Sequence, residues 1–439
     1  MRSRLTVTLG HAARLAARLR GGGSGGTAFP GLVMERADPG FLARTLNRLP
    51  RGVIVVSGTN GKTTTTKMVV QLLREQGLKV FTNRTGSNFV RGVLASLLTE
   101  VDAAGNLDAD IAVLELDEAH AVHFVARVRP RACLLLNVMR DQLDRFGEID
   151  YTASLLHSIA KATSDVVVLN GDDPRLAAPA FLEGVSARVV SFGTGEDLRS
   201  LFLSDDDLRT GQTGPRAHQD ESQIPGPRVT LEAIDGQRAT VRVDGASHEV
   251  DFAIPGVHNL LNACAALGVV LEVLGEDADL PGLLATLGTV QAAFGRGEVL
   301  TLDGRPVQLS LVKNPAGFRM SLLSAAAQAQ SGEVVVVAIN DEYADGRDMS
   351  WLWDVDFSAL RAGGVAVVTG VRAWDMALRL RYDEVEVAKV EPDLRRAVAL
   401  MRRVAADTDR PMRIFTTYTA MLALRSILGE MTDVEEVMS

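Results

Sequence analysis

The chain has 439 residues, of which 46% are hydrophobic and 23% are charged, and its net charge is −9. This composition predicts a globular protein large enough for about two or three domains. The acidic balance disfavours nucleic-acid binding, which usually needs a basic patch on a basic domain, so we expect no nucleic-acid partner.

Cysteine content and hydropathy indicate the cellular setting. The sequence holds 2 cysteines, Cys133 and Cys264, both in apolar surroundings, which predicts buried thiols in a reducing compartment. Two cysteines cannot form a four-cysteine zinc site, so no zinc is expected. No apolar run approaches the ~20 residues that cross a bilayer. We therefore expect a cytoplasmic protein.

A basic stretch opens the first segment, residues 1–48. Met1–Arg20 mixes arginines with leucine and alanine, and lacks the uninterrupted apolar core of a signal peptide. It predicts a short amphipathic helix. Two interpretations stay open, namely packing on the domain behind it and contact with a membrane surface. Gly21–Gly26 follows as a flexible linker.

The stretch Val53–Thr66 has the pattern of a phosphate-binding loop. Val53–Val56 predicts a buried strand, and a helical pattern runs from Lys62 to Arg74. Glycines in between let successive N–H groups and the helix N-terminus point at one phosphate group. The alternative is that Gly-Lys-Thr lies in an ordinary solvated turn.

We predict that the nucleotide-binding residues are consecutive: Gly58, Thr59, Asn60, Gly61, Lys62, Thr63 and Thr64. Lys62 would reach the terminal phosphates, and the hydroxyl of Thr63 or Thr64 would coordinate Mg²⁺. The usual motif has a glycine five residues before the Gly-Lys pair, but Val56 stands there. The loop is therefore a shortened form.

Strand-like runs continue in alternation with helical patterns up to about residue 195. They are Val80–Phe81, Ile111–Leu114, Cys133–Leu136, Val166–Leu169 and Val189–Phe192. This alternation predicts an α/β fold, a mostly parallel sheet covered by helices. Residues 200–228 form a polar insertion, and Val229–Val243 predicts an antiparallel hairpin around Asp235-Gly236. A helix is expected to follow His258.

A second alternating block begins near Val299. Strands are expected at Val334–Ile339, Val365–Val368 and Met412–Phe415, which predicts a smaller C-terminal α/β, Rossmann-like domain. We place the boundary near Gly295–Gly297. The expected domains are then residues 49–297 and residues 298–439.

Glu115 ends one of the predicted parallel strands. Ligands bind at the carboxyl ends of such strands, and Mg²⁺ prefers one or two carboxylates together with phosphate oxygens. Thr63 and Glu115 are therefore our predicted magnesium ligands. Asp117 and Glu118 have an alternative interpretation as caps of the following helix, so they are left out of the metal site.

The order of these motifs resembles that of the Mur ligase family, ATP-dependent enzymes that join amino acids to peptidoglycan precursors, and of the related folylpolyglutamate synthases. The residues that carry the resemblance are Gly58–Thr64, Glu115, Asp141–Asp144, Asn170–Pro174, His258-Asn259, Gly295-Arg296 and Lys313–Pro315. The resemblance implies an acyl-phosphate mechanism that uses ATP and Mg²⁺. It also implies that Asn259 contacts the adenine and that Arg296 contacts the phosphates.

Three departures from the family pattern carry information. The sequence before the loop is too short for a full UDP-binding domain, so we expect that domain to be absent. Gln142 stands where the family has a metal-linked histidine. Leu155 stands where a carbamylated lysine would be expected.

The C-terminal motifs Lys313–Gly317, Asn340–Asp354 and Tyr418-Thr419 resemble the MurT branch of this family. Many proteins of that branch carry a four-cysteine zinc ribbon, but residues 200–250 hold no cysteine. We expect a ribbonless version with the hairpin Val229–Val243 in that place.

The MurT branch supplies the synthetase subunit of lipid II isoglutaminyl synthase. The resemblance implies a heterodimer with a GatD-like glutamine amidotransferase, and lipid II as substrate. The reaction would be ATP-dependent amidation of a D-glutamate carboxylate at the inner face of the cell membrane. Asp348 and Lys62 would be catalytic, with Asp348 completing the partner's Cys-His pair. The alternative is a purely structural role, in which Asp341, Asp345 and Asp348 cap a turn.

Two rival functions stay open. One is a Mur or folylpolyglutamate-type ligase that adds an amino acid instead of ammonia. The other is a nucleotide-binding scaffold that uses ATP only to regulate assembly with a partner.

Overall fold

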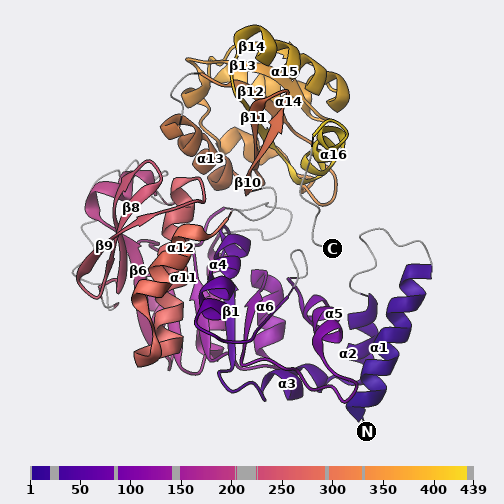
Figure 1. Cartoon of the computed structure of the whole chain (residues 1–439), viewed down its shortest axis with the longest axis vertical. Coiled ribbons are helices and arrows are strands. Elements are labelled where there is room, and N and C mark those ends of the chain that lie inside the picture. Colours follow the sequence, from indigo (N-terminus) through magenta and orange to yellow (C-terminus); the bar gives the residue numbers. More distant parts are fainter. Residues whose placement is uncertain are drawn as a thin grey trace. The chain divides into compact units, whose positions relative to one another are not determined.

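The apolar runs in the first half of the chain form one sheet in a computed structural model of the protein (Figure 1). The structure describes residues 2–19, 29–83, 88–140, 149–202, 226–291, 296–328 and 332–432, together with residues 204 and 224. The chain divides into two compact units. The first consists of Met1–Val138, Asp150–Ala253 and Asn259–Val290, and the second of Met139–Ile149, Ile254–His258 and Gln291–Ser439.

The sheet of the first unit has nine strands in the order β2-β3-β1-β4-β5-β6-β7-β8-β9. Neighbours are parallel from β2 to β7 and antiparallel from β7 to β9. The predicted parallel sheet and hairpin are confirmed. The strands are β1 (Val53–Ser57), β2 (Val80–Thr82), β3 (Ile111–Glu115), β4 (Ala132–Leu135), β5 (Val166–Asn170), β6 (Arg188–Thr194), β7 (Val229–Asp235), β8 (Arg238–Val243) and β9 (Ala246–Asp251).

Helices pack against this sheet because its central strands are apolar on both faces. All five residues of β1 are buried, as a continuous apolar run in a covered parallel sheet requires. The helices are α1 (Arg2–Leu19), α2 (Phe29–Ala37), α3 (Phe41–Leu46), α4 (Lys62–Glu75), α5 (Val90–Glu100), α6 (Glu118–Val125), α8 (Ile149–Ala162), α9 (Pro179–Leu182), α11 (Val257–Leu274) and α12 (Leu280–Thr289), with 3-10 turns η2 (Glu196–Leu201) and η4 (Gly275–Asp277).

Helix α11 corrects one expectation from the sequence. With η4 it forms a helical stretch of 21 residues whose most apolar part has a mean hydropathy of 1.6, which is long and apolar enough to cross a membrane by length and composition alone. However, 83% of its most apolar window is buried inside the protein. We therefore interpret α11 as the core helix of the first unit.

The second unit has a six-stranded sheet in the order β10-β11-β15-β12-β13-β14, parallel except for the β10–β11 pair. Apolar clusters cover both faces, one around Phe318 and Phe415 and the other around Met401 and Ile414. Its strands are β10 (Arg296–Leu302), β11 (Arg305–Leu311), β12 (Val334–Ala338), β13 (Val365–Thr369), β14 (Val387–Val390) and β15 (Met412–Thr416), and its helices are α13 (Pro315–Gln328), α14 (Ala373–Tyr382), α15 (Leu394–Thr408) and α16 (Tyr418–Gly429), with η5 (Ser350–Asp354) and η6 (Ser358–Leu360).

Both cysteines lie in the core of the first unit, Cys133 on β4 and Cys264 on α11. Burial raises the pKa of each thiol to about 12. The sequence-based interpretation of buried thiols is therefore confirmed.

Candidate active site

The loop between β1 and α4 has the backbone of a phosphate-binding loop. Gly58 and Gly61 have φ angles of 131° and 89°, in the range that favours glycine, and Gly61 precedes the first residue of α4. Asn137, just after β4, holds the loop in place. Its carbonyl accepts a hydrogen bond from Thr59 N at 3.1 Å, and its side chain bonds both the N–H and the carbonyl of Asn60, at 2.9 and 3.1 Å.

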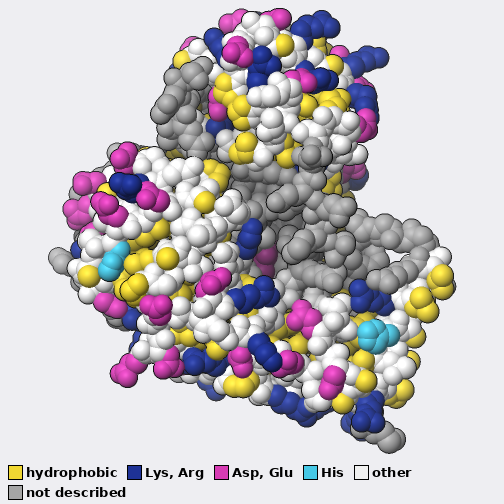
Figure 2. Space-filling view, viewed as in Figure 1, with side chains coloured by type: hydrophobic (Ala, Val, Ile, Leu, Met, Phe, Trp, Pro, Cys, Tyr) yellow, Lys and Arg dark blue, Asp and Glu magenta, His cyan; other side chains and the backbone are white. Residues whose placement is uncertain are grey.

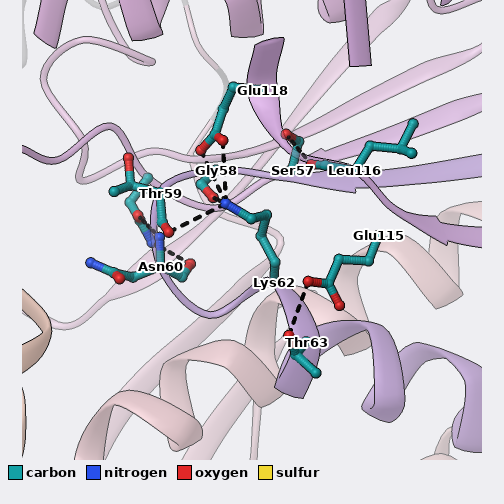
Figure 3. A network of polar contacts seen from close by, with 10 residues as sticks. Ser57, Gly58, Thr59, Asn60, Lys62, Thr63, Glu115, Leu116 and Glu118 are labelled. Carbon is teal, nitrogen blue, oxygen red and sulfur yellow. Dashed lines mark hydrogen bonds and ion pairs between the residues drawn. The ribbon is translucent and has the colours of Figure 1, made fainter. Parts of the chain in front are cut away.

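Figure 3 shows Lys62 turned back over this loop. Its ammonium group donates to the carbonyl oxygens of Gly58 at 2.5 Å and Thr59 at 3.4 Å. It also lies 3.2 and 3.3 Å from the two carboxylate oxygens of Glu118. The side chains of Lys62 and Glu118 are only 9% and 2% exposed.

The interpretation of Glu118 as a helix cap was therefore wrong. Glu118 is the first residue of α6, but its carboxylate is paired with Lys62 instead of with the helix N-terminus. Asp117 lies at the N-cap position of α6, yet its side chain makes no capping hydrogen bond. Sequence reasoning missed Glu118 because an acidic residue in a first helical turn usually needs no other explanation.

The two predicted magnesium ligands are neighbours. Thr63 Oγ1 donates to Glu115 Oε1 at 3.0 Å (Figure 3). Adjacent ligands of an octahedral Mg²⁺, with bonds of about 2.0–2.1 Å, would lie about 2.9 Å apart. Asn83 fixes the backbone of Glu115 through hydrogen bonds of 2.9 Å to its N–H and to its carbonyl. The pair therefore fits a magnesium site, with Thr63 and not Thr64 contacting the carboxylate.

Asn259 lies in the first turn of α11 and is buried. One turn later, Asn262 contacts the phosphate loop, since a Cβ on Gly61 would lie 2.7 Å from its Oδ1. Asn262 also donates to Asn259 Oδ1 at 3.5 Å. The i, i+3 spacing of the two asparagines is the signal that could have revealed Asn262 from sequence.

The other residues of the Mur ligase motifs are of two kinds, those outside the described residues and those with a structural role. Asp141–Asp144 lies outside the described residues, and so does the side chain of Arg296, which begins β10. Asp173 of the Asn170–Pro174 motif has a structural role, because its carboxylate accepts hydrogen bonds from Val138 N at 2.7 Å and Arg175 N at 2.9 Å. It joins the ends of β4 and β5.

In the second unit, the C-terminal motifs meet at one edge of the sheet. Asn340 follows β12, and Thr417 and Thr419 follow β15, its parallel neighbour. Asn340 N donates to Thr417 Oγ1 at 2.9 Å, and Asn340 Nδ2 donates to Thr419 Oγ1 at 3.1 Å. Buried Asp345 accepts hydrogen bonds from the N–H and hydroxyl of Thr419, at 2.7 and 2.5 Å. This network holds the segment after β12 against the start of α16.

The three aspartates of that segment have different surroundings. Asp345 is committed to Thr419, and Asp341 pairs with Arg372 at 3.5 Å. Asp348 is half-buried, and its Oδ1 accepts a hydrogen bond from Ser350 N at 2.9 Å. Hydrogen bonds from the hydroxyl and N–H of Ser350 hold the pKa of Asp348 below its usual value of 3.8. Asp348 therefore makes a turn hydrogen bond and stays ionised at neutral pH.

Comparison with known proteins places this arrangement in a class. The family described as Mur ligase middle domain matches residues 56–270, and the one described as MurT ligase C-terminal matches residues 311–421. Among solved structures, MurF ligase from Thermotoga maritima in complex with ADP has a TM-score of 0.65 at 18% identity, with 93% of this chain and 83% of that chain covered. A sheet with a phosphate loop after β1 and a separate second α/β unit is thus the Mur ligase architecture.

Two relatives narrow the class. The MurT subunit of lipid II isoglutaminyl synthase (glutamine-hydrolyzing) from Staphylococcus aureus (strain COL) is 30% identical over 410 residues, 89% of this chain and 91% of the relative. The subunit of the same name from Streptococcus pneumoniae (strain ATCC BAA-255 / R6) is 29% identical over 434 residues, covering 94% and 95%. The chain belongs to the MurT branch of the Mur ligase family.

Proposed function

We propose that this chain is the ATP-using subunit of a lipid II isoglutaminyl synthase. It would amidate the α-carboxylate of D-glutamate in the lipid II stem peptide, with ammonia released from glutamine by a partner subunit. The observation that carries the proposal is the presence in one chain of the phosphate loop, with its buried Lys62–Glu118 pair, and of a C-terminal unit of the MurT type. The name of the two MurT relatives supports the same reaction.

The chemistry requires activation, because a carboxylate resists attack by ammonia. Transfer of the γ-phosphoryl group of ATP to a carboxylate oxygen gives an acyl-phosphate and ADP. Ammonia then adds to the acyl carbon, the bond to the phosphate oxygen breaks, and phosphate leaves as the nitrogen loses a proton. A cation near the phosphates stabilises the charge that develops on them.

Lys62 is the group of the described chain best placed for that role. Its ammonium lies at the loop, where Glu118 and two carbonyl oxygens hold it. We infer that bound phosphates replace Glu118 as its counter-charge. Thr63 and Glu115 would hold Mg²⁺, whose positive charge would neutralise part of the charge of the phosphates. Asn259 at the adenine and Arg296 at the phosphates remain part of the proposal.

We further propose that Asp348 completes a glutaminase site on a GatD-like partner. An ionised carboxylate can orient and stabilise a catalytic histidine, and the lowered pKa of Asp348 keeps it ionised. Beside it, η5 and α14 expose an apolar row: Trp353, Trp374, Leu378 and Tyr382. The rings of Trp353 and Tyr382 meet edge to face at 5.1 Å between centroids.

Such a row is typical of a protein interface, because aromatic residues are enriched there and soluble proteins seldom expose contiguous apolar patches. It adjoins the segment that carries Asp348. We therefore assign this surface to the glutaminase subunit.

The test of the reaction is a reconstitution. Lipid II, ATP, Mg²⁺ and glutamine are incubated with this chain, with and without a co-purified glutaminase subunit, and the stem peptide is analysed by mass spectrometry. We expect amidation only with both subunits, and amidation by this chain alone when ammonia replaces glutamine. Amino-acid addition without amidation would favour the rival ligase. A Lys62→Ala variant that still forms product would favour the scaffold.

The test of Asp348 uses a matched control. Asp348→Asn should lower glutamine-driven amidation by about 100-fold or more and leave ammonia-driven amidation unchanged. Exposed Asp356 makes the same kind of turn hydrogen bond, from Ser358 N at 2.8 Å. If Asp348 only caps a turn, Asp348→Asn and Asp356→Asn will behave alike.

A further inference from the structure

Helix α1 is anchored to the first unit by one of its faces. Thr6, Val7, Gly10 and Ala13 are buried against α2 and α5. The packing at Gly10 is so close that an added Cβ would lie 2.8 Å from Leu98 Cδ1 of α5. The opposite face of α1 therefore has a fixed direction relative to this unit.

That opposite face is apolar. Leu5, Leu15 and Leu19 are 62%, 60% and 80% exposed, and exposed Leu9, Ala12 and Ala16 lie beside them. In Figure 2, hydrophobic side chains are visible along the outer edge of the helix that Figure 1 labels α1. A surface helix normally presents polar residues to solvent. Here the buried face holds no leucine, and the leucines face outward.

Positive charge borders the leucines. Arg2, Arg4 and His11 are exposed, and the helix sequence Arg2–Leu19 contains no Asp or Glu. This local excess of cations occurs in a chain whose net charge is −9. An apolar face bordered by arginines is the pattern of helices that lie in the interface of a membrane. Anionic headgroups attract such residues within a Debye length.

We propose that α1 docks this chain on an anionic lipid bilayer, with its leucine face at the level of the headgroups. The inference deepens the proposed function, on which it rests for the location of a lipid-linked substrate. An anionic bilayer offers an apolar acyl region for the leucines and negatively charged headgroups for the arginines. A second copy of the chain would instead bring arginines next to arginines. Because α1 is packed tightly, docking would hold the phosphate-loop unit at the membrane surface.

Vesicle co-sedimentation of the full chain tests the contact. We expect binding to vesicles that contain phosphatidylglycerol and much weaker binding to pure phosphatidylcholine. Leu15→Glu should weaken binding about tenfold, because one apolar side chain is lost from the interface. The matched control is Leu422→Glu, at an exposed leucine on α16 in the second unit, which should bind as the wild type does. Arg4→Gln should weaken binding about fivefold.

Three results would overturn the proposal. The first is that the wild type sediments with neither kind of vesicle, and the second is that the wild type and Leu15→Glu bind vesicles equally. The third is that the wild type binds no vesicles but forms a dimer in size-exclusion chromatography, which Leu15→Glu dissociates. Circular dichroism of each variant verifies that the helix and fold persist.

A pair of substrates separates this inference from the proposed function. Amidation is measured with lipid II in vesicles and with a water-soluble muramyl peptide that has the same stem. Leu15→Glu should slow only the first reaction. If neither substrate is amidated by the complete enzyme, the proposed function fails while the sedimentation result stands. Equal slowing of both reactions would contradict membrane docking.

Discussion

At the scale of single residues, the most consequential contact is the buried pair of Lys62 and Glu118. Both charges are almost fully removed from water, and each depends on the other. Removing one partner of a buried pair leaves an uncompensated charge. The stability of the loop should therefore depend on whether nucleotide phosphates are bound beside Lys62.

We predict that Glu118→Gln lowers the free energy of unfolding by about 3 kcal/mol in the absence of nucleotide. Mg-ATP should raise the unfolding temperature of this variant more than that of the wild type, because the phosphates supply the missing counter-charge. Thermal unfolding with and without nucleotide measures both effects. Asp108→Asn, which removes the exposed partner of Lys79, should change stability by less than about 0.5 kcal/mol. An equal nucleotide effect in variant and wild type would contradict this role of Glu118.

A second prediction concerns substitution of Gly61 in the phosphate loop. Its φ of 89° strains any other residue, and an added Cβ would collide with Asn262. Gly61→Ala should cost about 1–2 kcal/mol of stability and raise the Kd for ATP by at least about tenfold, measured by calorimetry. Gly77 has a φ of 82° with nothing near its Cβ position, so Gly77→Ala should cost similar stability and leave ATP binding unchanged. Equal losses of affinity in both variants would mean that the contact with Asn262 is unimportant.

The local sequence predicted the residues of the loop but not their partners. Gly58, Gly61 and Lys62 are recognisable because turn, strand and helix are consecutive. The loop is contacted by Asn137, Glu118 and Asn262 only because β3 and β4 flank β1 and because α11 packs nearby. No local sequence pattern predicts these long-range pairings. A first-turn acid such as Glu118 looks the same whether it is exposed or buried.

At the scale of elements, a charged cluster connects three helical segments of the first unit. Glu35 on α2 accepts hydrogen bonds from Arg91 on α5 at 2.8 Å and from Arg127, just after α6, at 2.7 Å. Burial alone would raise the pKa of Glu35, but the two arginines lower it below the usual 4.5. Glu35 is therefore more stable ionised in the folded protein than in the unfolded chain.

The pH dependence follows from that direction. Since the folded pKa is lowered, the stabilisation is complete above the unfolded pKa near 4.5 and is lost as pH falls through the folded pKa. We predict that Glu35→Gln costs about 1–3 kcal/mol at pH 7 and that the difference from wild type shrinks below pH 4.5. Urea unfolding at pH 7 and in acid measures it. A difference that stays constant with pH would contradict the charged pair.

Elements with weak patterns escaped prediction. Only Val250 of β9 is buried, and β14, an edge strand of the second sheet, has no fully buried residue, so neither shows an alternating run. Helix α1 was predicted, but not the direction of its leucines. Its small residues fit against α2 and α5, and that fit, not hydrophobicity, sets the buried face.

At the scale of the whole molecule, the two units carry different optical probes. All 3 tryptophans, Trp351, Trp353 and Trp374, belong to the second unit. Tryptophan fluorescence therefore reports unfolding of that unit, whereas far-ultraviolet circular dichroism reports both.

We predict that Glu118→Gln, in the first unit, lowers the midpoint of the dichroism transition and leaves the fluorescence midpoint unchanged. The physical reason is that each unit has its own sheet and its own buried apolar residues. Parallel urea titrations with the two probes test it. Equal shifts in both probes would mean that the units unfold as one cooperative structure.

The buried cysteines have a practical consequence. A thiol reacts as its thiolate, and Cys133 and Cys264, each with a pKa of about 12 and no exposure, offer almost none at neutral pH. A single cysteine introduced on the surface of each unit would thus be labelled selectively without replacing either native cysteine. Fluorescence energy transfer between two such labels could then follow the distance between the units during ATP turnover.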